Sequence, residues 1–166
     1  HIVFNMLLLV MFGSHLERIW GAKRYFIFYF ACGIGALVLY NSIGVVQIYQ
    51  LKQALIADGY NMDVVNEYIW GGNVRQLPIL SANSQELFNE YSAMVFSSMA
   101  GASGAVFGIL TAFGMLYANS LIYIYFLFPL KAKYVVSGLI VYELYRGFAN
   151  NPNDNVAHFA HLGGAL

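Results

Sequence analysis

Residues 25–43 read YFIFYFACGIGALVLYNSI and contain no charged side chain. An α-helix rises about 1.5 Å per residue, so about 20 apolar residues span the hydrocarbon core of a bilayer. The stretch therefore predicts a transmembrane helix. Lys23 and Arg24 stand directly before it, and positive charge of this kind favours the inner side of a membrane.

The composition of the whole chain agrees with a membrane protein. Of its 166 residues, 60% are hydrophobic and only 10% are charged, whereas soluble domains carry about 25% charged residues. So few charges would leave large apolar patches in water, which excludes an ordinary cytosolic enzyme or a disordered region. The net charge of zero disfavours a nucleic-acid binder. A single cysteine, Cys32, excludes an internal disulfide and a cysteine-rich metal site.

Other apolar stretches predict additional membrane-spanning helices at residues 1–13, 101–119, 134–148 and, as the start of a last helix, 156–166. Gly104 and Gly108 have the four-residue spacing that lets helix backbones approach closely in lipid. Residues 120–130 are too short to span and predict a connector at the membrane interface. The sequence thus predicts an all-α fold, a polytopic transmembrane helical bundle.

The segment 44–100 differs from the rest, because it holds seven of the sixteen charged residues. Its apolar residues recur at helical spacing, which predicts short amphipathic helices and not spans. The expected boundaries are Gly59 as a stop, Asp63 as an N-cap, Gly71 and Gly72 as a second stop, and Asn83 with Glu86 at capping-box spacing. We expect a helical extramembrane insertion within a single membrane domain over residues 1–166.

The charges also predict an orientation. If the first residue is outside and the crossings alternate, the inner loops hold one acid, Glu17, and five cations: Arg18, Lys23, Arg24, Lys131 and Lys133. This distribution fits the positive-inside rule. It places His1, residues 101–103 and the turn 149–158 on the same, outer side.

Four polar residues then converge at one membrane depth: Ser103, His161, His1 and Asn5. Such residues are costly in lipid and are candidates for a functional site. A serine becomes a nucleophile when a neighbouring base takes its proton, and a histidine that rests neutral can do so. Unpaired N–H groups at a helix start, with donors from His1 and Asn5, could hold an oxyanion. The pattern predicts nucleophilic hydrolysis.

Three motifs in this order resemble those of the rhomboid family of intramembrane serine proteases. They are HxxxN at residues 1–5, GASG at 101–104 and AHLGG at 160–164. The LERxxG pattern at 16–21 adds to the resemblance, which covers nearly the whole chain except 44–100. It implies that Ser103 is the nucleophile and His161 the general base, a dyad without an acidic third member, and that His1 and Asn5 assist the oxyanion hole.

The resemblance also assigns three supporting residues. Gly101 matches the first glycine of the family motif, and Gly164 matches a glycine that allows close contact between the catalytic helices. Phe107 stands where the family often has a tyrosine that packs on the catalytic histidine. The resemblance further implies a helix before His1 and a longer last helix, so we expect this chain to be truncated at both ends.

The function expected from these motifs is cleavage of transmembrane segments of other membrane proteins within the lipid bilayer. We expect no cofactor, no metal and no nucleic acid. The expected location is a bacterial inner membrane, crossed several times, with the active site open to the outer side. Two alternatives stay open: a non-catalytic rhomboid-like protein that binds membrane clients, and a fragment of a transporter or channel.

Several other residues have structural interpretations that compete with a functional one. His158 is a rival for His161 as the base, but we expect it at the water boundary, and the HxxH spacing is a weak metal signal without nearby carboxylate or thiol ligands. Glu143 and Arg146 are spaced as an ordinary i,i+3 pair near the interface. Cys32 is expected to be a small apolar filler.

Overall fold

A computed structural model describes residues 2–71, 82–96, 102–124, 128–149 and 158–166. The chain divides into two compact units, one formed by His1–Asn41 with Met99–Leu166 and the other by Ser42–Ser98. The second unit covers nearly the same residues as the segment 44–100 that the charge distribution singles out. Its placement outside the membrane stays a prediction.

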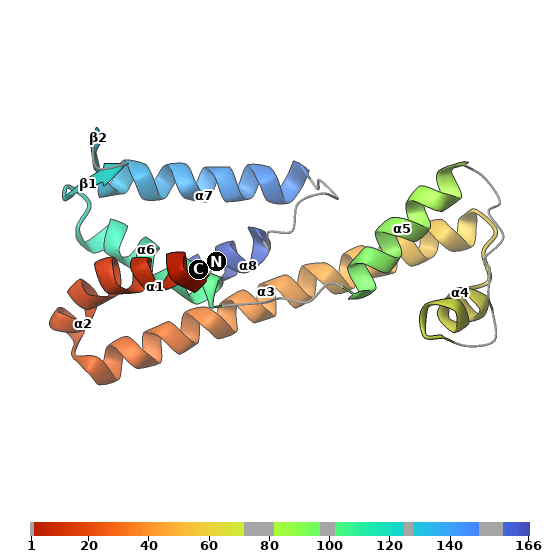
Figure 1. The fold of residues 1–166 in the computed structure, drawn as a ribbon, viewed down its shortest axis with the longest axis horizontal. Coiled ribbons are helices and arrows are strands. Elements are labelled where there is room, and N and C mark those ends of the chain that lie inside the picture. Colours follow the sequence, from red (N-terminus) through yellow and green to blue (C-terminus); the bar gives the residue numbers. More distant parts are fainter. Residues whose placement is uncertain (1, 72–81, 97–101, 125–127, 150–157) are drawn as a thin grey trace. The chain divides into compact units, whose positions relative to one another are not determined.

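The first unit is helical (Figure 1). Its helical elements are α1 (Ile2–Leu8), the π-helical turn η1 (Leu9–Gly13), α2 (Ser14–Trp20), the first part of α3 (Ala22–Ala57), α6 (Ser103–Leu116), α7 (Ala132–Ala149) and α8 (His158–Ala165). The chain turns from α2 into α3 at Gly21, whose φ of 77° is a conformation that glycine adopts without strain.

Two helical stretches in the described part of the chain are long and apolar enough to cross a membrane, Ile2–Trp20 and Ala22–Ala57. α6 is apolar but has 14 residues. α7 has 18 residues and includes three charged ones, Lys133, Glu143 and Arg146. Apart from one short hairpin, the described elements are helices, so the predicted all-α class is confirmed.

The length of α3 corrects one prediction. A crossing was expected to end at Ile43 and a separate short helix to end at Gly59, but α3 runs without a break for 36 residues. Nothing between Ile43 and Ala57 stops a helix, since the segment has no proline and one glycine, Gly44. A single interior glycine costs a helix only about 1 kcal/mol. The helix ends before Gly59, whose φ is 96°.

A β-hairpin connects α6 to α7 in the segment that was expected to be a connector at the membrane interface. β1 (Leu121–Ile124) pairs antiparallel with β2 (Phe128–Lys131), with Leu121 opposite Lys131 and Ile124 opposite Phe128. Three of the four residues of β1, Ile122, Tyr123 and Ile124, are β-branched or aromatic, and such residues favour extended backbone. Pro129 fits because each strand of a two-stranded sheet has an unpaired edge.

α6 is the central helix of the first unit. It contacts α8, α7, η1, α1 and α2, and every residue from Gly104 to Gly114 except Ala112 is buried. Its apolar side chains join those of η1, α2 and α7 in one core, made of Phe12, Leu16, Ile109, Leu110, Phe113, Ala132 and Val136. The rings of Phe12 and Phe113 meet edge to face at 4.8 Å. α6 is thus held on several sides.

Glycines bring α3, α6 and α8 into backbone contact. A methyl group added at Gly163 on α8 would lie 2.6 Å from the carbonyl oxygen of Gly35 and 2.9 Å from Cα of Ala36. One added at Gly104 on α6 would lie 2.9 Å from the carbonyl oxygen of Ala160. Small residues at helix interfaces allow this close approach in membranes.

The second unit has its own small core. The end of α3 packs with α4 (Met62–Ile69) and α5 (Ala82–Phe96) around Leu55, Tyr60, Met62, Val65 and Tyr91. The fully buried hydroxyl of Ser84 donates a hydrogen bond to Asp58. The helical spacing of apolar residues in this segment correctly predicted short helices at α4 and α5.

Two capping predictions in this unit are wrong. The N-cap of α4 is Asn61, whose side-chain oxygen accepts a hydrogen bond of 2.8 Å from the N–H of Asp63. Asp63 lies in the first turn instead, where its charge complements the helix dipole. Asn83 lies inside α5, which begins at Ala82, so it is not at the N-cap position.

The glycine contacts predict the effect of one added methyl group. Gly163→Ala should lower the free energy of unfolding by about 1–3 kcal/mol, the usual cost of overpacking a tight interface, because backbone atoms of α3 leave no room for the new carbon. Thermal unfolding of the protein in detergent measures the loss.

The matched control is Gly138→Ala on α7, where an added carbon would meet nothing within 4 Å. This variant should unfold at the same temperature as the unmodified protein or slightly above it. Equal stability of the two variants would contradict the proposed backbone contact.

Candidate active site

Ser103 and His161 lie on two helices that touch at neighbouring residues. Ser103 is the first residue of α6, and His161 lies in the first half of α8. The next residue of α6, Gly104, packs on the carbonyl group of Ala160, which directly precedes His161. A carbon added at Gly164 would overlap the carbonyl group of Gly104. The structure therefore brings the serine and histidine segments together.

An aromatic contact indicates which face of α6 meets His161. The ring of Phe107 stacks on the imidazole of His161, with ring centroids 5.5 Å apart and planes 9° apart. Ser103 precedes Phe107 by four residues, and residues at this spacing share one face of a helix. Ser103 is half-buried and stands one turn before the residue that touches His161. In the described residues, its hydroxyl is not hydrogen-bonded to His161.

The start of α6 offers backbone hydrogen-bond donors beside Ser103. The first intrahelical bond of α6 runs from the N–H of Val106 to the carbonyl of Ala102, at 3.0 Å. The N–H groups of Ser103, Gly104 and Ala105 precede this bond and have no intrahelical acceptor. Donors in this position can stabilise a developing oxyanion.

The remaining residues expected in the site are placed only in part. Asn5 is half-buried on α1, which packs against α6. His1 and Gly101 lie outside the described residues. Their roles, like that of Asn5, stay predictions.

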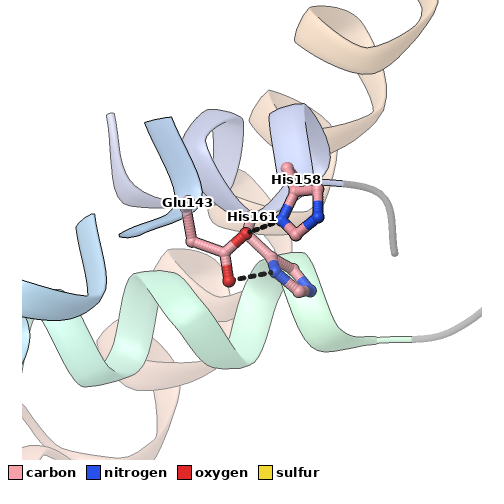
Figure 2. Close-up of polar contacts among 3 residues, drawn as sticks. All are labelled: Glu143, His158 and His161. Atoms are coloured by element: carbon pink, nitrogen blue, oxygen red, sulfur yellow. Dashed lines mark hydrogen bonds and ion pairs between the residues drawn. The ribbon is translucent and has the colours of Figure 1, made fainter. Parts of the chain in front are cut away.

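Glu143 is a site residue that the sequence analysis missed. Its carboxylate is buried on α7 and lies between two histidines of α8 (Figure 2). Oε2 accepts a hydrogen bond of 2.6 Å from Nδ1 of His158, and Oε1 lies 3.1 Å from Nδ1 of His161. His158 was expected at the water boundary; its side chain is buried against Glu143, and its depth in the membrane stays a prediction.

The contact between Glu143 and His161 is close but not aligned. Although 3.1 Å separates the two atoms, Nδ1 of His161 is buried and has no hydrogen-bond partner among the described residues. The carboxylate therefore meets the ring at ion-pair distance but not in hydrogen-bond geometry. The other ring nitrogen, Nε2, does not take part in this contact.

Glu143 could have been found from the sequence. A carboxylate in an apolar helix is costly and indicates function by default, whereas the spacing to Arg146 had suggested an ordinary surface pair. His158 and His161 are three residues apart, so they share one face of α8. The sequence did not show that this face meets the Glu143 side of α7. No group of three His, Cys, Asp or Glu residues in the described part could hold a metal ion.

The long apolar helices and the glycine contacts define a helical membrane protein. Polar side chains of three packed helices, α6, α7 and α8, gather near one another in it. A model of the rhomboid domain matches residues 1–49 and 71–166, and the chain therefore belongs to the rhomboid family. The match leaves out residues 50–70, which belong to the second unit. No curated protein and no solved structure matched the chain.

Family membership confirms the predicted class. The protein is an integral membrane protein with a helical membrane bundle. Rhomboid proteins are largely intramembrane serine proteases that act on transmembrane protein substrates in the bilayer, and the family also includes inactive members.

Proposed function

We propose that this protein is an intramembrane serine endopeptidase in which Ser103 is the nucleophile and His161 the general base. One observation carries the proposal: Phe107 stacks on His161, and Ser103 lies one turn earlier on the same face of α6. The backbone contact between Gly104 and Ala160 supports it, because it joins the residues adjacent to the serine and the histidine.

The chemistry follows from these two side chains. Oγ of Ser103 attacks the carbonyl carbon of the scissile peptide bond while Nε2 of His161 takes the hydroxyl proton. The tetrahedral intermediate collapses, His161 gives the proton to the departing amine, and an acyl-enzyme remains. A water molecule, deprotonated by His161, then hydrolyses the ester and restores the serine.

The oxyanion that forms in both steps needs hydrogen-bond donors. The N–H groups at the start of α6 supply donors beside Ser103, and we assign His1 and Asn5 as side-chain donors. Gly101 and Gly164 support the site by allowing close approach of backbone. Loss of one oxyanion donor typically lowers kcat by about 10²–10³-fold.

The substrates of this reaction are transmembrane segments of other membrane proteins. A regular helix hides its carbonyl groups, so the cleaved segment has to unwind near the site. The charge distribution favours a site open to the outer side of the membrane, and the location we propose is a bacterial plasma membrane. The alternative is a rhomboid protein that binds membrane clients without cleaving them. Replacement of Ser103 or His161 distinguishes the two functions, because it abolishes cleavage only in a protease.

The stack on His161 predicts a moderate contribution of Phe107 to the rate. Phe107→Leu should lower kcat by about 2–10-fold, because aromatic pairs contribute about 0.5–1.5 kcal/mol beyond their burial. Phe107→Tyr keeps the ring and should retain activity. Cleavage of a model transmembrane substrate in liposomes measures both. Phe26→Leu, at a side chain that is 62% exposed, is the control, and an equal loss there would contradict the role of the stack.

Replacement of the proposed nucleophile tests the function itself. Ser103→Ala and His161→Ala should each abolish cleavage of the model substrate, and Ser103→Ala should also abolish labelling by a serine-directed fluorophosphonate probe. Ser137→Ala, at an exposed serine of α7, should change neither result. Cleavage by Ser103→Ala at the unmodified rate would overturn the proposal. Client binding by the unmodified protein without cleavage or labelling would instead support the non-catalytic alternative.

A further inference from the structure

A buried ionisable cluster consists of Glu143, His158 and His161. The mechanism proposed above uses only His161 of these three. The exposed fraction of the side chain is 9% for Glu143, 8% for His158 and 16% for His161. A buried carboxylate is costly unless charged or hydrogen-bonding partners compensate it. Each of its oxygens faces one histidine nitrogen (Figure 2), so the cluster is complete only with both histidines.

The two contacts differ in a way that indicates different roles. The bond from His158 is short, at 2.6 Å, and fixes the carboxylate through Oε2. This leaves Oε1 next to Nδ1 of His161, at 3.1 Å and without alignment. Catalytic hydrogen bonds are often poorly aligned without substrate and tighten when it binds.

A carboxylate beside Nδ1 of His161 determines whether Nε2 of the same ring can accept a proton. An ionised carboxylate only accepts hydrogen bonds, so it favours the tautomer of His161 that carries its proton on Nδ1. Nε2 is then unprotonated and can accept the proton of a serine. The stacked ring of Phe107 fixes the plane of the imidazole, and the carboxylate fixes its direction within that plane.

We propose that Glu143 is a positioning residue for His161, held in place by His158, so that the site of this protein works as a serine–histidine–glutamate system. The proposal rests on the proposed function of Ser103 and His161. When His161 takes the serine proton it becomes a cation, and the carboxylate at Oε1 stabilises that cation. This differs from the dyad without an acidic member that the family resemblance implies.

Glu143→Gln is the decisive variant, because the amide keeps the size of the side chain and removes its charge. We expect kcat for a transmembrane substrate to fall about 10²–10⁴-fold, the range expected when an acid that orients a catalytic histidine loses its charge, with KM changed less than about twofold. Glu143→Asp keeps the charge and should recover part of the rate. Glu86→Gln, an exposed carboxylate on α5, should leave kcat unchanged.

A purely structural role for the cluster makes a different prediction. His158→Gln breaks the shorter bond but leaves Glu143 beside His161, so it should lower kcat much less than Glu143→Gln does. If the cluster only joins α7 to α8, the two variants should lose activity in proportion to their loss of thermal stability. Equal kcat losses at equal stability would overturn the positioning role.

The tautomer can be observed directly. Nitrogen NMR of protein labelled at histidine should show His161 protonated at Nδ1 and not at Nε2, and Glu143→Gln should weaken this preference. This readout and probe labelling need no substrate, so they test the site separately from substrate binding. An unchanged tautomer in Glu143→Gln would also overturn the proposal.

The two proposals fail separately. If Ser103→Ala cleaves the substrate, the proposed function is wrong. If Ser103→Ala is inactive and Glu143→Gln retains full kcat, only the role of Glu143 is wrong.

Discussion

The backbone contact between α6 and α8 is the constraint on which the rest of the first unit depends. Lipid tails are as apolar as the helices, so helix association in a membrane relies on close packing and not on hydrophobic burial. Gly104 and Gly164 remove the side-chain carbons that would separate the two helices. The distance between the segments of Ser103 and His161 therefore follows from residues that carry no chemistry themselves.

The sequence predicted this arrangement where the signal was local. Apolar length predicted the first crossings, four-residue spacing of small residues predicted close packing at Gly104, and the motifs singled out the serine and histidine segments. Phe107 was expected to pack on His161 from the family resemblance alone, and the ring lies parallel to that imidazole. The apolar lengths and the small-residue spacing depend on residues close together in the chain, whereas the Phe107–His161 stack joins distant segments and came only from the resemblance.

The features that were missed depend on partners distant in sequence or on the absence of a signal. α3 continues to Ala57 because nothing stops it, and a missing stop is hard to see in a polar segment. The choice of Asn61 over Asp63 as a cap depends on a turn geometry that both residue types favour. Glu143 was interpreted through its neighbour Arg146, although its partners His158 and His161 lie 15 and more residues further along.

The position of Glu143 changes how the site is held together. A serine–histidine pair requires only that α6 and α8 keep their distance, which their glycines ensure. A carboxylate from α7 adds a third helix, and α7 meets α8 through a larger side chain, since Phe159 packs over Gly147. That contact leaves more freedom than a backbone contact does. Because Nδ1 of His158 donates a hydrogen bond to one oxygen of the carboxylate and Nδ1 of His161 lies 3.1 Å from the other, the cluster itself restricts that freedom. The direction of the imidazole of His161, the proposed base, then becomes a property of three helices.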